Sequence, residues 1–281
     1  MDSSLAIAPA AAGLDAFDAV TSRMIPIARL EAEEAAIAER YRSAKPYPHV
    51  VIDGFFDAEI LDRIEASFPR RTNPEWISYD TSNEVKSTSR GILGLDPFAQ
   101  TFFWQGTSPR FLAWLERVTG VAQLAADPTF HGGGLHESRR GGWLNMHVDW
   151  TQHPHLPLVR QLNMIVYLNR DWDVAWGGAL ELKHATTGEG GAKVAPLFNR
   201  AVIFPTTSET LHGFPDPITC PADRARRSAS WFYWSPDQEA IQRGAPITFL
   251  PGTRQTKLRS FLRSCVPPIA FQVRDRLRGR S

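Results

Sequence analysis

The chain has 281 residues, of which 43% are hydrophobic and 22% are charged, and this composition excludes a wholly disordered protein. Lys and Arg number 31 against 30 Asp and Glu, so the formal net charge of +1 excludes the strong positive field of many nucleic-acid-binding proteins. The two cysteines, Cys220 and Cys265, do not have the C-x-x-C spacing of a zinc knuckle or a redox pair.

The start of the chain predicts a cytoplasmic protein without a membrane span. No apolar run approaches the roughly 18 residues that a transmembrane helix needs. The Ala-rich beginning carries Asp2 and no early Lys or Arg, so it lacks the pattern of a secretory signal peptide. We expect residues 1–22 to form a weakly ordered tail.

The first third of the chain is predicted to be mainly helical. Residues 27–41 are rich in Ala, Glu and Arg, and Pro46 and Pro48 then exclude a longer helix. Asp57 is a candidate N-cap for a second helix that runs to Phe68. The other expected elements of this part are a strand at 49–52, a polar loop or lid at 70–90, and short helices at 97–104 and 108–118.

After Ala126, short apolar runs alternate with clusters of Gly, Pro and Asn, which is typical of a β-sandwich or β-barrel. The expected strands lie at 129–134, 143–150, 162–168, 179–182, 201–204 and 228–234. We therefore predict an α+β, mainly β fold. Its N-terminal helices buttress a β core at about 127–235, within a single domain at 23–253.

Residues 254–281 form a basic extension with eight Lys or Arg and one acid, Asp275. Such a segment can contact a membrane surface, a nucleic acid or an acidic partner, or it can be a solvated helix packed on the domain. Pro267 and Pro268 interrupt any long helix, and we favour the solvated segment.

A metal site is indicated by His147-Val148-Asp149 and by His212, which follows much later. On a strand, positions 147 and 149 point to the same face and lie roughly 7 Å apart, close enough to share one metal ion. A second histidine completes a set of two imidazoles and one carboxylate. This set leaves open positions and suits non-haem Fe(II).

Short motifs surround this pair in a fixed order. In chain order they are Gly141-Gly142-Trp143-Leu144, Arg160-Gln161-Leu162-Asn163, Tyr167-Leu168-Asn169, Gly177-Gly178, Asn199 to Pro205 (N-R-A-V-I-F-P), Leu211-His212-Gly213 and Arg226-Arg227-Ser228. This order closely resembles the Fe(II)- and 2-oxoglutarate-dependent dioxygenases of the prolyl-4-hydroxylase-like superfamily. The resemblance covers about 129–234, and residues 47–56 are similar to the first strand of such proteins.

The resemblance implies a double-stranded β-helix, or jelly-roll, with iron at one mouth. It implies that Fe(II), 2-oxoglutarate and O2 are used, and that His147, Asp149 and His212 are the iron ligands. Related halogenases carry Gly or Ala at the position of Asp149, so a carboxylate there favours hydroxylation, or another oxidation without halogen.

Two adjacent arginines are candidates to bind the distal carboxylate of 2-oxoglutarate, because a guanidinium binds a carboxylate through two hydrogen bonds. Arg226 would share its face of a strand with Ser228, and this pair resembles the Arg-x-Ser anchor of the family. Arg227 would share the opposite face with Ala229 and Trp231. We favour Arg226.

Two further residues are candidates for cosubstrate contacts. His136 lies where relatives place a side chain that helps to hold 2-oxoglutarate, although it would equally suit a strand end. Asn163 is placed to bond the metal-binding carboxylate of 2-oxoglutarate, or to be a satisfied amide of the core. Trp150, next to the metal-binding sequence, is a candidate wall of the substrate pocket.

The predicted function is hydroxylation of an unactivated C–H bond in a small molecule or an amino-acid-derived substrate, with release of succinate and CO2. No nucleic-acid partner is expected, and the sequence does not indicate an oligomeric state. Three alternatives remain open: a hydroxylase of protein or peptide residues, a jelly-roll binding module without catalysis, and a cupin-like isomerase or oxygenase that does not use 2-oxoglutarate.

Overall fold

The computed structural model describes residues 20–69, 73, 76–187 and 191–237. The basic extension expected at 254–281 and most of the tail expected at 1–22 lie outside the described residues. Within them, no helix is long and apolar enough to cross a bilayer.

Helices α2 (Ile27–Ala32) and α3 (Glu34–Ser43) replace the single helix expected at 27–41, because Glu33 leaves the helical conformation with φ −96° and ψ 1°. Strand β1 (Val50–Asp53) and helix α4 (Ala58–Ala66) follow as predicted. The Asp57 carboxylate caps α4 by accepting a hydrogen bond from the Glu59 amide at 2.9 Å. Local capping chemistry therefore decides where this helix begins.

Residues 76–89 of the polar segment form a β-hairpin, and the prediction of a loop there was wrong. Strands β2 (Trp76–Asp80) and β3 (Glu84–Ser89) pair in antiparallel register, and β3 also pairs with two strands of the main sheet. The hairpin is polar because one of its faces lines an open cavity, so the apolar alternation of a strand on a core is missing.

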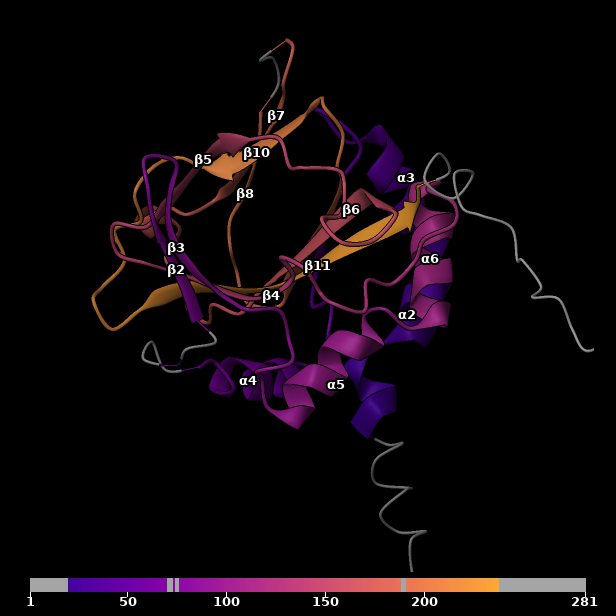
Figure 1. Cartoon of the computed structure of the whole chain (residues 1–281), viewed down its shortest axis with the longest axis horizontal. Helices are drawn as coiled ribbons and strands as arrows, with labels where there is room; N and C mark the ends of the chain where they lie inside the picture. The colour runs from indigo at the N-terminus through magenta and orange to yellow at the C-terminus, as the bar shows by residue number, and fades with distance from the viewer. Residues whose placement is uncertain (1–19, 70–72, 74–75, 188–190, 238–281) are drawn as a thin grey trace, which may run out of the picture. The chain divides into compact units, whose positions relative to one another are not determined.

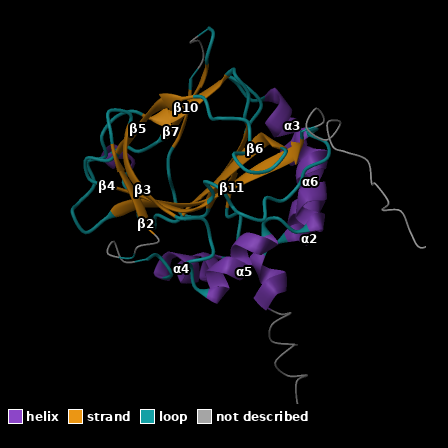
Figure 2. Cartoon of the chain, in the orientation of Figure 1, coloured by secondary structure: helices purple, strands orange, loops and turns teal. Residues whose placement is uncertain are grey.

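Helices α5 (Pro97–Gln105) and α6 (Pro109–Thr119) confirm the two short helices predicted before the β core. Asp96 caps α5, and Gly120 ends α6 in the left-handed conformation with φ 77°. Figure 2 shows the helices outside the ring of strands, with α4 and α5 beneath it and α2, α3 and α6 beside it.

The remaining strands are β4 (Gly134–Arg139), β5 (Trp143–His147), β6 (Leu158–Tyr167), β7 (Leu180–His184), β8 (Ala192–Val194), β9 (Arg200–Pro205), β10 (Thr210–Phe214) and β11 (Ala225–Pro236), with a short 3-10 helix, η1 (Val174–Trp176), before β7. The strand expected at 129–134 was misplaced: pairing with β11 begins only at Gly134, after a turn that includes Gly132. β8 and β10 were not among the expected strands.

All strand pairs are antiparallel, in the order β1-β9-β6-β11-β4-β3-β5-β10-β7-β8, with β2 beside β3. The sheet curls into a nearly closed, jelly-roll-like barrel (Figure 1), as predicted. Indole and phenol groups of β11 tie the sheet to α5. Trp231 donates to the Phe103 carbonyl and Tyr233 to the Gly106 carbonyl, each at 3.0 Å.

Side chains alternate along β11 between two environments. Ala229, Trp231 and Tyr233 pack into the apolar core between the sheet and the helices. Ser228 and Ser230 face the interior of the barrel, where they line a cavity. This alternation confirms the predicted face pattern of the strand and sets the direction of the arginines at its start.

Candidate metal centre

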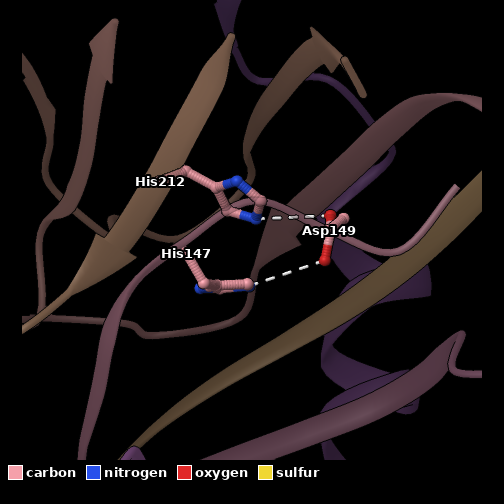
Figure 3. A group of neighbouring side chains, drawn as sticks. All are labelled: His147, Asp149 and His212. Carbon is pink, nitrogen blue, oxygen red and sulfur yellow. Dashed lines mark ion pairs between the residues drawn. The ribbon is translucent and has the colours of Figure 1, made fainter. Parts of the chain in front are cut away.

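Two neighbouring strands bring the predicted metal ligands together (Figure 3). His147 is the last residue of β5, and it pairs in register with His212 in the middle of β10. Asp149 was expected on a strand, but it lies two residues beyond the end of β5. Its side chain turns back toward both histidines.

The Asp149 carboxylate lies between the two imidazoles. Oδ1 is 3.5 Å from Nε2 of His147, and Oδ2 is 3.4 Å from Nε2 of His212. One donor atom from each residue lies within 4.8 Å of the others, and among the described residues no other group of His, Cys, Asp and Glu meets this criterion. The backbone therefore places the two nitrogens and one oxygen around a common point.

Backbone carbonyls orient both imidazoles. Nδ1 of His147 donates to the Asn145 carbonyl at 2.9 Å, and Nδ1 of His212 faces the Thr210 carbonyl at 3.5 Å. A carbonyl can only accept, so the Nδ1–H form of His147 leaves the lone pair of Nε2 free to bind a metal.

The charge states at the site suit a divalent cation. Burial lowers the pKa of His212 to about 4, so its imidazole is neutral at neutral pH. Burial opposes ionisation of Asp149, yet the charge of Arg160 and the hydrogen bond from Asn163 hold the pKa of this carboxyl well below its usual range. Metal ligands must be deprotonated, and neutral imidazole nitrogens with one carboxylate fit Fe(II).

Two connected cavities reach this point. The inner one, about 100 Å3, lies inside the barrel between the three metal-binding candidates and Arg226. The outer one, about 770 Å3, lies between the β2–β3 hairpin and the residues around Trp150, and it also reaches His147 and Asp149. The candidate metal centre thus lies where the two cavities meet.

Arg226 points into the inner cavity and is only 6% exposed. Its Nε donates to the Gly178 carbonyl at 2.7 Å, and its Nη2 donates to the Tyr167 hydroxyl at 3.2 Å. The guanidinium also lies 4.2 Å from the ring centroid of Phe214. Among the ion pairs of the described residues none includes Arg226, and a buried cation without a counter-ion is costly.

Residues 133–234 match the family model of the 2OG-Fe(II) oxygenase superfamily. This part of the chain is similar to a 2OG-Fe(II) oxygenase domain. Members of this superfamily use Fe(II), 2-oxoglutarate and O2, and the two imidazoles and one carboxylate of the site fit that metal. A comparison with curated protein sequences finds no significant match.

Solved structures support the same fold. A prolyl-4-hydroxylase from Pseudomonas putida is similar over 71% of this chain and 97% of its own length, with 17% identity and a TM-score of 0.50. A Trichoplax adhaerens prolyl hydroxylase in complex with a hypoxia-inducible-factor peptide fragment matches 78% of this chain and 96% of its own, with 11% identity and a TM-score of 0.51. The epimerase SnoN from nogalamycin biosynthesis matches 80% and 94%, with 18% identity and a TM-score of 0.53.

The second arginine of the pair lies on the outer face of the barrel. Arg227 binds Glu137 at 3.0 Å and Glu65 at 2.5 Å, and its guanidinium lies over the ring of Phe68. Because its charge is already matched by carboxylates, Arg227 is not available to a ligand inside the barrel.

His136 lines both cavities and is paired in register with Ser228. The side chain as a whole is half-buried, but its Nε2 is fully covered and has no hydrogen-bond partner in the described structure. Burial lowers the pKa of His136 to about 3, so the imidazole is neutral. A covered nitrogen without a partner in a polar cavity is suited to a ligand group.

Asn163 and Arg160 contact the carboxylate of Asp149, the candidate metal ligand. The Asn163 amide donates to Oδ2 of Asp149 at 2.7 Å, and Nη2 of Arg160 lies 3.2 Å from the same oxygen. Asn163 is thus engaged within the protein. Arg160 was present in the motif that suggested the family, but sequence reasoning gave it no role.

The other histidines near the outer cavity hold or pack against neighbouring parts of the protein. Nδ1 of His153 accepts hydrogen bonds from the amides of His155 and Leu156, and its Nε2 faces Asp127 at 3.3 Å. Both ring nitrogens of His153 are therefore occupied in holding a turn. His131 packs against Trp150, with ring centroids 5.2 Å apart.

Proposed function

We propose that this oxygenase is a hydroxylase that binds Fe(II) through His147, Asp149 and His212 and the distal carboxylate of 2-oxoglutarate through Arg226. One observation carries the proposal: the three ligands and a buried arginine without a counter-ion line the same inner cavity. A dicarboxylate that reaches the metal at one end meets the guanidinium at the other. The negative charge of its distal carboxylate would pair with Arg226, which has no acidic partner among the described ion pairs.

Iron and 2-oxoglutarate, when bound, would supply the oxidising chemistry together with O2: one oxygen atom of O2 would enter succinate as 2-oxoglutarate loses CO2, and the other would convert a substrate C–H bond to C–OH. The side chains of the chain bind and orient the reactants. The Nδ1–carbonyl contacts hold the two imidazoles, and Tyr167 and Gly178 hold the Arg226 guanidinium in a fixed direction. The apolar ring of Phe214 helps to keep water from this end of the cavity.

His136 is proposed to donate a hydrogen bond to bound 2-oxoglutarate through its unpartnered Nε2. A neutral imidazole donates through one nitrogen without adding a charge to the cavity. Asn163 was expected to contact the metal-binding end of 2-oxoglutarate. Since its amide is held by Asp149 and Arg160, we propose that any such contact is secondary to its role beside the metal ligand.

The proposed substrate is a small molecule or an amino-acid-derived molecule that occupies the outer cavity. A volume of about 770 Å3 is within the range of roughly 300–1,000 Å3 that is usual for small-molecule sites. Trp150 is 43% exposed there, next to a metal ligand, and offers a flat apolar surface for a ring or an aliphatic chain. Similar folds are found in a peptide-bound prolyl hydroxylase and in SnoN, so a peptide substrate is the main alternative.

The alternatives differ in what they require of Arg226. A binding module without catalysis requires neither the complete ligand set nor the arginine, and a cupin-like enzyme that does not use 2-oxoglutarate has no need of a buried cation in this cavity. The presence of all four residues favours the hydroxylase.

The test uses the whole chain, prepared without metal and handled under nitrogen. Addition of Fe(II) and then 2-oxoglutarate should produce a visible metal-to-cosubstrate absorption band, and admission of air should release succinate. His147→Ala should abolish both signals. His184→Ala on β7 is a matched control that should retain both signals, because this half-buried imidazole pairs with Glu209 and lines neither cavity.

Absence of the band in the wild-type protein would overturn the proposal and favour a binding module. To separate substrate classes, succinate release is then measured with panels of ring-containing small molecules and of short peptides, for the wild type and Trp150→Ala. Stimulation by small molecules that Trp150→Ala weakens supports the proposed class. Stimulation by peptides alone would refute it.

A further inference from the structure

Arg160 is a buried cation at the junction of the two cavities. Its side chain is 2% exposed, and its guanidinium lies 3.3 Å from the ring centroid of Phe232 and 5.1 Å from that of Trp150. Its acidic partner among the described ion pairs is Asp149, with Nη2 3.2 Å from Oδ2. A guanidinium held between two rings has little freedom to leave that oxygen.

Asn163 closes a loop of three side chains around the same oxygen. Nε of Arg160 donates to Oδ1 of Asn163 at 3.0 Å, and Nδ2 of Asn163 donates to Oδ2 of Asp149 at 2.7 Å. The Thr206 hydroxyl also donates to Oδ1 of Asn163, at 3.4 Å. These donors fix which way the amide faces, so its NH2 group must point at Asp149.

The two oxygens of the carboxylate are therefore not equivalent. Oδ2 accepts a hydrogen bond from the Asn163 amide at 2.7 Å and forms an ion pair with the Arg160 guanidinium at 3.2 Å, so both neighbours engage this oxygen. Oδ2 also lies 3.4 Å from Nε2 of His212, but Asn163 and Arg160 already engage it, so Oδ1, 3.5 Å from Nε2 of His147, is the oxygen left for a cation.

We infer that Arg160 and Asn163 are positioning residues that hold Asp149 by Oδ2 and so make it bind the metal through Oδ1 alone. The inference rests on the proposed function. One oxygen and two imidazole nitrogens occupy three of six positions and leave three for 2-oxoglutarate and O2. A carboxylate that bound the metal through both oxygens would leave only two open coordination positions. Arg160 and Asn163 would thus determine how many positions stay open.

The test measures metal binding without turnover. Metal-free protein is titrated with Mn(II), and free Mn(II) is followed by electron paramagnetic resonance, for Arg160→Gln, Asn163→Ala and the double variant. Loss of outer-shell contacts typically weakens metal binding by roughly 10- to 100-fold, and we expect this of each single variant. Because the two residues act as one unit, the double variant should lose less than the product of the single effects.

Arg170→Gln is the matched control. Arg170 also lies over an aromatic ring, at 3.8 Å from the centroid of Phe198, and binds a carboxylate, Asp62, but it does so at the surface. Its replacement should leave the Mn(II) affinity within about twofold of the wild type, as expected for an exposed pair. Arg160→Lys tests the geometry, because it keeps the charge but cannot bind Asn163 and Asp149 through a fork. It should also weaken Mn(II) binding.

A second readout is the absorption band of Fe(II) with 2-oxoglutarate under nitrogen, which should shift or weaken in Arg160→Gln and Asn163→Ala and not in Arg170→Gln. Wild-type affinities in both single variants would overturn the inference, even if their thermal unfolding temperatures fell. If Arg160→Gln is unfolded, as shown by loss of its near-ultraviolet circular dichroism, the Mn(II) affinity of Asn163→Ala alone tests the inference. Failure of the wild type to bind Mn(II) or to form the band would instead count against the proposed function.

Discussion

Replacement of Arg226 by Met separates ligand binding from folding. Arg226 is 6% exposed, and its partners are neutral: the Gly178 carbonyl at 2.7 Å and the Tyr167 hydroxyl at 3.2 Å. Met keeps an unbranched apolar chain of similar length, so no large cavity should form. The change therefore removes the charge and its hydrogen bonds, and little else.

Two opposing effects act on the free energy of unfolding of the metal-free protein. Loss of the charged hydrogen bond to Gly178 costs roughly 1.5–3 kcal/mol. Removal of a desolvated cation that has no counter-ion stabilises the folded state by a similar amount, because the burial of one ion costs several kcal/mol. We expect the metal-free Arg226→Met variant to be as stable as the wild type to within about 2 kcal/mol.

The affinity for 2-oxoglutarate should change far more. Without the guanidinium the distal carboxylate would be buried and unpaired, which costs roughly 3–5 kcal/mol. A tenfold change corresponds to about 1.4 kcal/mol, so the dissociation constant should rise by at least roughly 100-fold. The assay is an anaerobic titration of the Fe(II)-loaded protein with 2-oxoglutarate, followed by the visible absorption band, together with urea denaturation of the metal-free protein.

Arg227→Met is the control, and it should change stability but not 2-oxoglutarate binding. Arg227 is paired with Glu137 and Glu65 on the outer face and its side chain is 26% exposed, so its loss should lower the free energy of unfolding by roughly 1–2 kcal/mol. Its 2-oxoglutarate affinity should match the wild type. The reasoning is refuted if Arg226→Met binds 2-oxoglutarate normally, or if Arg227→Met loses that affinity.

Two further predictions concern the metal-free protein. Burial lowers the pKa of His136 to about 3, below its value of about 6.5 in an unfolded chain, so between these values the unfolded state binds a proton that the folded state does not. Stability should therefore fall as the pH is lowered from 7 to 4, by up to roughly 3 kcal/mol from this group, and His136→Gln should reduce the fall in urea denaturation at the two pH values. An unchanged pH dependence would contradict this assignment. Gly106→Ala would place a methyl group 2.3 Å from Nε1 of the buried Trp231, and overpacking of this kind costs roughly 1–3 kcal/mol. Wild-type stability in denaturation followed by tryptophan fluorescence would show that α5 can move away from β11.

Local features of the sequence were good guides where a few neighbouring residues decide the conformation. Asp57 and Asp96 cap helices by accepting hydrogen bonds from amides two residues on, and Gly120 ends a helix because it adopts a positive φ. The same holds for β11, where strict alternation placed Ala229 and Trp231 on the core side.

Local features failed where distant partners decide. The polar residues at 76–89 form a hairpin because β4 and β5 provide hydrogen-bonding partners for β3, and no pattern within the segment reveals this. Asp149 lies beyond the end of its strand, and its carboxylate is directed by Arg160 and Asn163 across the barrel.

The sequence by itself determined the types and order of the chemical groups at the site: the His-x-Asp pair, the later histidine and an arginine followed two positions on by serine. It did so because these motifs are short and their spacing along the chain is visible. Only the tertiary structure decided which charges are matched. Arg227 and Arg226 are adjacent in the chain, yet one binds two carboxylates outside the barrel and the other has no acidic partner among the described ion pairs. The burial and pairing of a side chain depend on residues that folding brings together from distant parts of the chain. These residues leave Arg226 without an acidic partner in the inner cavity, and they engage Oδ2 of Asp149.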